Sequence, residues 1–260
     1  MTGGKETRIS RITKKGRMVC VPMDHGVTNG PLPGLASVHR TIELVSSAGA
    51  TAVLAHKGVI RTMPQPAGTG LIVHLNASTE YSPSPNLKVL VAGVMEAVRL
   101  GADAVSVHVN IGSDEEPHML RDLGAVAYEC SEWGVPLVAM MYPRGPRIKA
   151  IDTNTVAHVA RIGAELGSDI VKTVYPGSPE GLDVVRDGCY VPLVLAGGPK
   201  NNSDIDTLKL AEEAVRHGWS GVAFGRNVFS HSRPDLITSA LCGVVLGGKS
   251  ADECSRILEQ

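Results

Sequence analysis

Eight short apolar runs recur along the chain at similar distances, and this repetition restricts the possible folds more than any other feature. The runs start near residues 18, 51, 71, 104, 137, 169, 192 and 220, at intervals of 20 to 33 residues. Their mean interval, about 29 residues, is close to the roughly 30 residues of one strand–helix–strand unit. Nearly every position within the runs is apolar, which is typical of strands covered on both faces and predicts a parallel sheet.

Helical patterns fill most of the stretches between these runs. Four of them are followed directly by glycine, which readily adopts the left-handed conformation that ends many helices. Ser113 with Glu116, and Ser250 with Glu253, have the spacing of a capping box at two further helix starts. The stretch 57–70 has no clear helical pattern, and we expect a long loop there. The four glycine-terminated patterns cover residues 36–48, 87–100, 153–166 and 205–217.

Eight strand–helix units in 260 residues predict an α/β protein with one domain, a (β/α)8 TIM barrel spanning residues 1–260. An open, doubly wound sheet is the structural alternative, but no G-x-G-x-x-G motif follows the first run. Residues 1–17 carry six lysines and arginines against one glutamate. We expect them to form a solvated lead-in segment and not a targeting signal.

The charge balance and the cysteines exclude several classes of protein. The 25 basic and 26 acidic residues leave a net charge of −1, which argues against a nucleic-acid-binding protein. No apolar stretch reaches the roughly 18 residues of a membrane span. The five cysteines include no C-x-x-C pair, which indicates reduced thiols. We therefore expect a cytoplasmic protein with no nucleic-acid or membrane partner.

Titratable side chains follow the carboxyl ends of the expected strands, where a TIM barrel carries its active site. Such groups converging on one mouth predict an enzyme site. They include Asp24, His25, His56, His108, Tyr142, Arg144, Lys172 and Arg226.

Lys172 is the most informative of these residues because it lies within a strand, after Ile170 and Val171. Burial should lower the pKa of its ammonium and leave a neutral amine that can attack a carbonyl. Alternatively, its ammonium reaches solvent at the strand end or forms a structural ion pair with Asp24. Tyr142 and Asp24 could donate or accept protons, although a packed tyrosine and a loop-capping aspartate explain them equally well.

Gly197, Gly198, Gly225 and Arg226 follow the last two strands. Exposed backbone amides, a short helix and one guanidinium at this place favour a phosphate site over two tight turns. Arg144 could hold a second anion or carboxylate, or cap a loop.

A different interpretation uses histidine. His56, His74 and His108 end neighbouring strands, and three histidines can hold a catalytic divalent metal ion in a lyase. Isolated histidines at strand ends also serve as hydrogen-bonded structural groups. A barrel that binds phosphate without catalysis is a further alternative, in which Lys172 has no covalent role.

Taken together, the motifs resemble the archaeal-type class I aldolases related to fructose-bisphosphate aldolase. The likeness extends over nearly the whole chain and includes VPMDHGVTNGP, HKGVIR, GADAVSVHVNIGSDE, LVAMMYPRG, GSDIVKTVYPG and GVAFGRNVF. The resemblance implies a Schiff base on Lys172, with Tyr142 as proton donor and Asp24 as proton acceptor. It also implies that the donor binds near Asp24 and His25, that its phosphate binds the glycines and Arg226, and that no cofactor or metal is needed.

Met140 refines this resemblance. Sugar-bisphosphate aldolases of this kind carry tryptophan two residues before the catalytic tyrosine, whereas Met140 precedes Tyr142 as in the heptulosonate synthases and their bacterial aminohydroxybenzoate-pathway relatives. This subgroup implies transfer of a three-carbon unit from a ketose phosphate or dihydroxyacetone phosphate to L-aspartate 4-semialdehyde. Fructose-1,6-bisphosphate aldolase is the alternative. The family also implies a homo-oligomer, such as a ring-shaped decamer.

Overall fold

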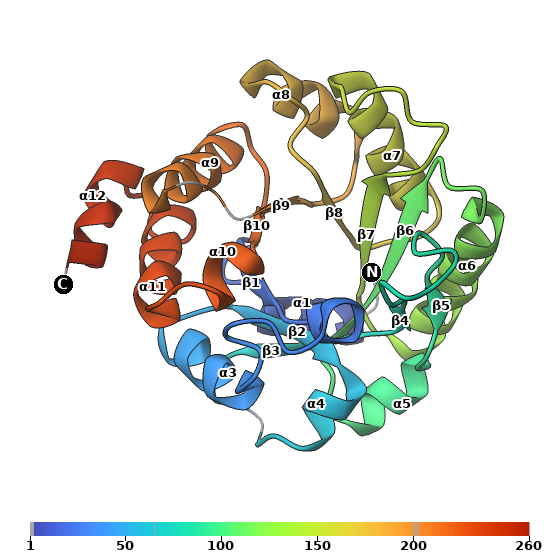
Figure 1. Ribbon diagram of the computed structural model, residues 1–260, viewed down its shortest axis with the longest axis horizontal. Helices are drawn as coiled ribbons and strands as arrows, with labels where there is room; N and C mark the ends of the chain where they lie inside the picture. The colour runs from blue at the N-terminus through green and yellow to red at the C-terminus, as the bar shows by residue number, and fades with distance from the viewer. Residues whose placement is uncertain (1–2, 65, 200, 202, 260) are drawn as a thin grey trace.

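The eight apolar runs form eight parallel strands that close into a barrel in the computed structural model, which describes residues 3–64, 66–199, 201 and 203–259. Neighbouring strands follow the order β1-β10-β9-β8-β7-β6-β3-β2, and β2 pairs with β1 to close the ring (Figure 1). The (β/α)8 barrel is therefore confirmed, and the open-sheet alternative is wrong. The strands are β1 (Met18–Pro22), β2 (Ala52–His56), β3 (Gly70–His74), β6 (Ala104–Ile111), β7 (Leu137–Pro143), β8 (Ile170–Thr173), β9 (Leu193–Ala196) and β10 (Gly221–Ala223).

Helices surround the barrel, as Figure 1 shows in a view along its axis. The glycines after four expected helices, Gly49, Gly101, Gly167 and Gly218, all have positive φ, as predicted. The helices are α1 (Gly3–Ile12), α2 (His25–Asn29), α3 (Val38–Ser47), α4 (Lys57–Arg61), α5 (Val94–Arg99), α6 (Glu116–Trp133), α7 (Thr153–Glu165), α8 (Pro179–Gly188), α9 (Asp204–Arg216), α10 (Arg226–Phe229), α11 (Pro234–Val245), α12 (Ala251–Ser255) and the 3-10 helix η1 (Arg256–Glu259).

Three local expectations need correction. The stretch 57–70 is not all loop, because α4 occupies its first five residues. The helical pattern at 87–100 contains a helix only from Val94, since Val89–Leu90 form β5, which pairs with β4 (Asn76–Ala77) in a small antiparallel hairpin. Ser113 forms no capping box because the helix starts only at Glu116, whose carboxylate accepts the Gly112 amide at 2.6 Å. The box at Ser250 and Glu253 is confirmed.

The two faces of the strands bury different apolar clusters. Successive residues of a strand point to opposite faces. Val171 and its equivalents therefore pack between the strands and the helices, whereas Ile170 packs inside the barrel with residues such as Val138, Met140 and Val194. Lys172 and Tyr142 continue the inward-facing rows toward the carboxyl ends of β8 and β7. Burial on both faces explains the unbroken apolar runs.

Residues 1–17 are more than the solvated lead-in segment that we expected, because α1 covers the amino end of the barrel (Figure 1). Ile12 is fully buried and packs with the inward-facing residues of the strands. Lys5 forms an ion pair with Asp169 at 2.8 Å, and Arg11 forms one with Asp103 at 3.2 Å. Two basic residues of this segment thus attach α1 to the loops before β6 and β8.

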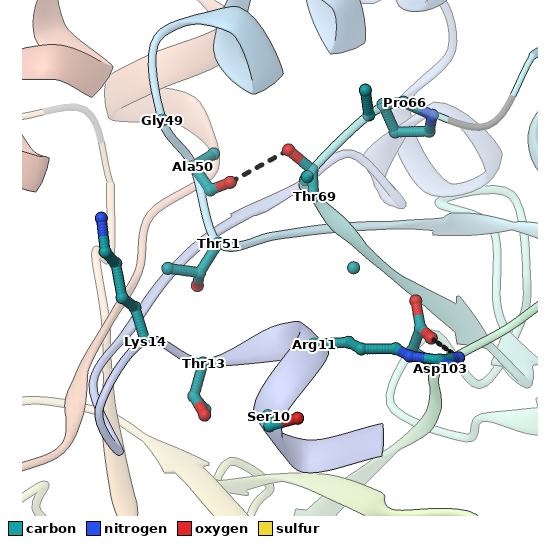
Figure 2. A pocket seen from close by; sticks show the side chains of 13 residues that line it. Ser10, Arg11, Thr13, Lys14, Gly49, Ala50, Thr51, Pro66, Thr69 and Asp103 are labelled. Carbon is teal, nitrogen blue, oxygen red and sulfur yellow. Dashed lines mark hydrogen bonds and ion pairs between the residues drawn. The ribbon is translucent and has the colours of Figure 1, made fainter. Parts of the chain in front are cut away.

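A hollow of about 740 Å³ lies beside α1 at this amino end (Figure 2). Its hydroxyl groups bond to nearby backbone: Thr69 donates to the Ala50 carbonyl at 3.1 Å, and Thr51 donates to the Val19 carbonyl at 3.2 Å. Arg11 is occupied by Asp103. The hollow is larger than the cavity at the opposite end, but its hydroxyl groups and Arg11 are already paired and it gathers no set of reactive side chains. We therefore place the chemistry at the carboxyl end.

Candidate active site

A cavity of about 510 Å³ opens at the carboxyl ends of the strands, and residues from all eight strand ends line it. Every site residue predicted from the sequence lies there. The lining includes Asp24, His25, His56, His74, His108, Tyr142, Arg144, Lys172, Gly197, Gly198, Gly225 and Arg226. The barrel closure, which brings β1 next to β10, gathers residues as far apart in the chain as Asp24 and Arg226.

Lys172 lies within β8, opposite Met140 of β7 and Val194 of β9. Its side chain is only 6 % exposed, so the ammonium does not extend freely into solvent. Burial alone would lower its pKa, but its interactions with Tyr142 and Asp24 outweigh that effect and raise the pKa. The predicted burial is confirmed, whereas the predicted lowering of the pKa is wrong. The resting amine is therefore protonated.

Tyr142 lies two residues after Met140 on the same face of β7, which places it one layer closer to the mouth than Lys172. The His108 ring lies 4.7 Å from the Tyr142 ring, centroid to centroid. On the mouth side, the Arg144 guanidinium carbon lies 5.4 Å from the Tyr142 ring centroid. The phenol thus lies between the His108 ring and the Arg144 guanidinium and beside the lysine, where it can exchange protons.

Asp24 follows β1 and brings a carboxylate to the other side of the cavity. Its Oδ1 lies 3.5 Å from His25 Nδ1, and its Oδ2 lies 4.0 Å from His74 Nε2. Burial would raise the pKa of Asp24, but the nearby histidines and Lys172 lower it well below its ordinary value. Asp24 is therefore a carboxylate at neutral pH, and its buried Oδ1 accepts no hydrogen bond from the described residues.

The two glycine-containing loops lie side by side at the ends of β9 and β10. The Arg226 guanidinium donates to the Gly198 carbonyl at 3.1 Å and joins the loops. A Cβ on Gly225 would lie 2.8 Å from His25 Cε1 and 2.9 Å from the Pro22 carbonyl oxygen, so only glycine fits there. The bare backbone of both loops and the Arg226 cation face one cavity, an arrangement that suits a phosphate.

A family model for DeoC/LacD aldolases matches residues 18–231, which include all eight strands and every residue of the predicted site. The chain belongs to the DeoC/LacD family of aldolases. The prediction of an aldolase-type enzyme with a TIM-barrel fold is thereby confirmed.

Characterised relatives of this aldolase extend over nearly its full length. A 2-amino-3,7-dideoxy-D-threo-hept-6-ulosonate synthase from Archaeoglobus fulgidus is 46 % identical over 254 residues, covering 96 % of this chain and 94 % of the relative. A 2-amino-4,5-dihydroxy-6-oxo-7-(phosphonooxy)heptanoate synthase from Streptomyces griseus is 42 % identical over 232 residues, covering 88 % and 85 %. The resemblance to this group of synthases, drawn from the sequence motifs, is therefore confirmed.

Solved structures agree with the fold of this aldolase. A Schiff-base-forming fructose-1,6-bisphosphate aldolase superimposes with a TM-score of 0.88 at 29 % identity, covering 94 % of this chain and all of the other. An archaeal fructose-1,6-bisphosphate aldolase, whose catalytic lysine is covalently bound to a carbinolamine intermediate, gives a TM-score of 0.87 at 30 % identity, covering 94 % and 99 %.

The three strand-end histidines of this aldolase do not form the metal site of the alternative interpretation. The described residues contain no group of three His, Cys, Asp or Glu side chains placed to hold a metal ion. His74 Nδ1 lies 2.7 Å from the Ser106 hydroxyl, and His108 Nε2 lies 2.8 Å from Asn110 Oδ1. Burial lowers the pKa of His74 to about 3 and also lowers that of His108. Both are neutral hydrogen-bonding groups.

Lys88 lines the same cavity, and the sequence analysis missed it. It is 8 % exposed and immediately precedes β5, within the stretch that we read as a helix. On a helix, Lys88 would be an ordinary solvated residue. Pro83 and Pro85 just before it were the available signal, because prolines at this spacing favour turns over a continuous helix.

The described part of the chain has no helix long and apolar enough to cross a membrane.

Proposed function

We propose that this aldolase joins a three-carbon phosphorylated ketone unit, from dihydroxyacetone phosphate or a ketose phosphate, to L-aspartate 4-semialdehyde through a Schiff base on Lys172. The observation that carries the proposal is the convergence of a buried lysine, a tyrosine, a carboxylate and an anion-binding pair of loops on one cavity. The names of the 42–46 % identical synthases support this substrate pair. Met140, which lies opposite Lys172, supports it over fructose-1,6-bisphosphate.

Phosphate binding is the first step. The loops of Gly197–Gly198 and Gly225, with Arg226, hold the donor phosphate, which positions the ketone carbon beside Lys172. His25 packs against Gly225 and contacts the donor near Asp24. Fixing the ketone in this way turns the attack by the lysine into a step within one complex.

Covalent chemistry then proceeds on the lysine. Lys172 is protonated at rest, so its ammonium must lose a proton before the free amine attacks the ketone carbon. Tyr142 relays that proton to the new alkoxide oxygen. Loss of water from the carbinolamine leaves an iminium, which withdraws electrons from the adjacent carbon. With dihydroxyacetone phosphate, the Asp24 carboxylate removes a proton from that carbon and leaves an enamine. With a ketose phosphate, the hydroxyl group at the cleaved bond gives its proton to the same carboxylate, the C–C bond breaks, an aldehyde leaves, and the same enamine remains.

Bond formation completes the cycle. The enamine carbon attacks the aldehyde carbon of the acceptor, and the aldehyde oxygen takes a proton from Tyr142. Water then adds to the regenerated iminium, and hydrolysis releases the ketone product and the Lys172 amine. Asp24 accepts a proton and stabilises the cationic intermediates beside it, in agreement with its ionised resting state.

Reductive trapping tests this proposal. Sodium borohydride added with dihydroxyacetone phosphate should inactivate the enzyme and add the reduced donor to Lys172, as mass spectrometry of the digested protein would reveal. EDTA should have no effect on activity. Lys172→Met should abolish the adduct and the activity but retain binding of inorganic phosphate.

Three outcomes would contradict the proposal. Loss of activity with EDTA and no adduct would favour metal-dependent chemistry. Full activity of Lys172→Met in cells that depend on the gene would favour a phosphate-binding protein without catalysis. A higher kcat/KM with glyceraldehyde 3-phosphate than with L-aspartate 4-semialdehyde would favour fructose-1,6-bisphosphate aldolase.

The cytoplasmic location and the homo-oligomeric state stay predictions. All five cysteines are free thiols, which supports a reducing compartment. Analytical ultracentrifugation of the purified chain would test for the ring-shaped oligomer.

A further inference from the structure

Lys88 is a buried cation whose direct partner in the described chain is a neutral group. Its ammonium donates a hydrogen bond to the neutral Ser78 hydroxyl, and it forms no ion pair with a carboxylate in the described ranges. The side chain is 8 % exposed and lines the cavity. Burying a charge without a counter-ion is costly, so a lysine in this position calls for an anion that arrives from outside the chain.

Arg144, an exposed residue, lines the same cavity. Its guanidinium stacks near the Tyr142 ring and forms no ion pair with a carboxylate among the described residues. Burial and then the charge of Arg144 lower the pKa of Lys88, and the charge of Asp24 acts in the opposite direction. The two cations thus line one cavity, and neither forms an ion pair with a carboxylate of the described residues, which is the pattern of an anion-binding subsite.

The topology separates this subsite from the phosphate loops. Lys172 lies on β8, and β9 and β10, which carry the glycine loops and Arg226, follow on one side of it in the barrel order. On the other side lies β7, which carries Arg144, and beyond it β6, against which the β4–β5 hairpin packs. Figure 1 shows this hairpin beside β6. The reacting lysine is thus flanked by two cationic regions, each suited to one anionic end of a substrate.

We propose that Lys88, together with Arg144, binds the carboxylate of the acceptor aldehyde and so determines which aldehydes this enzyme accepts. The inference rests on the proposed function, in which the donor phosphate occupies the Arg226 side. In L-aspartate 4-semialdehyde the carboxylate is at the end of the molecule opposite the aldehyde. Holding that end at Lys88 directs the aldehyde carbon toward the enamine on Lys172.

A comparison of two aldehydes tests the role of Lys88. In the wild-type enzyme, kcat/KM should be much higher with L-aspartate 4-semialdehyde than with butanal, which has no carboxylate. Lys88→Met should lower kcat/KM for the semialdehyde by roughly ten- to a hundredfold, the usual loss for a hydrogen bond to a charged group, and leave the value for butanal unchanged. Lys88→Arg should restore much of the preference, and Lys249→Met, at an exposed lysine outside the cavity, should retain all of it.

The alternative is that Lys88 only stabilises the loop that contains Ser78 and Pro85, since the Ser78 hydroxyl itself donates to the Pro85 carbonyl at 3.0 Å. In that case Lys88→Met would lower kcat/KM for both aldehydes by the same factor and lower Tm, which would overturn the proposal. A loss of kcat/KM in Lys88→Met that affects only glyceraldehyde 3-phosphate, and leaves the value for the semialdehyde unchanged, would also overturn the proposal. The subsite would then hold a phosphate and not a carboxylate. Borohydride trapping with dihydroxyacetone phosphate alone involves no acceptor. Failure of that trapping in the wild-type enzyme would refute the Schiff-base function. Normal trapping in Lys88→Met would show that the substitution leaves the donor chemistry intact, so that a loss of activity with the semialdehyde concerns the acceptor subsite alone.

Discussion

His74 should make the stability of this protein fall as the solution becomes mildly acidic. Its ring is 3 % exposed, and burial is the main cause that lowers its pKa from the ordinary 6.5 to about 3. Below pH 6.5 the unfolded chain therefore binds a proton at this residue that the folded chain does not. The free energy of unfolding decreases by up to about 1.4 kcal/mol per pH unit in this range, or about 2 kcal/mol between pH 7 and pH 5. Asp24 adds nothing there, because a depressed carboxyl pKa affects stability only nearer pH 4.

The variant His74→Asn isolates this contribution. The asparagine amide reaches the position of Nδ1 and can still bond the Ser106 hydroxyl, which lies 2.7 Å from that nitrogen. Urea unfolding, followed by circular dichroism at one protein concentration, measures the free energy of unfolding at pH 7 and at pH 5. The decrease in this free energy from pH 7 to pH 5 should be about 2 kcal/mol larger for the wild type than for the variant. His158→Asn, at an exposed histidine of α7, should keep the wild-type dependence. Equal pH dependences in wild type and His74→Asn would refute the reasoning.

Two further changes test other parts of the structure. Gly225→Ala should displace the phosphate loop, since its Cβ would meet the Pro22 carbonyl oxygen at 2.9 Å. We expect kcat/KM for dihydroxyacetone phosphate to fall roughly 10- to 100-fold. The value for unphosphorylated dihydroxyacetone should change little. Ile12→Ala should remove the fully buried contact of α1 with the barrel and cost about 2–5 kcal/mol of stability, measured by urea unfolding. Glu6→Ala, at an exposed position of α1, should have no such effect, and equal stabilities would mean that α1 does not close the barrel.

The sequence was sufficient for the barrel and for most of its active site. Parallel strands buried on both faces must be apolar throughout, so they stand out as runs with a regular interval. A lysine within such a run breaks the pattern, which is why Lys172 could be recognised as an active-site residue. Asp24, Tyr142 and Arg226 were predictable for a related reason: each lies within three residues of the end of a strand, and the fold brings all these strand ends to one mouth.

Features that depend on contacts between distant segments could not be predicted in this way. The helix α1 contributes a single buried residue, Ile12, so the polar composition of residues 1–17 indicated a solvated segment. Lys88 reaches the cavity only because β4 and β5 pair, and each strand has two residues, too few for a periodic signal. The charge of Lys172 depends on the positions of Tyr142 and Asp24, which lie on other strands.

The charges around the cavity explain why its histidines are neutral. Its lining holds four cations, Lys88, Arg144, Lys172 and Arg226, but Asp24 is its only carboxylate among the described residues. Protonating His25, His56, His74 or His108 would add to this excess, and burial lowers the pKa of all four. The whole chain has a net charge of only −1, so the positive potential is a local property of the site. A substrate pair with a phosphate at one end and a carboxylate at the other would neutralise this potential, and a neutral group in place of the carboxylate would leave the buried Lys88 unpaired.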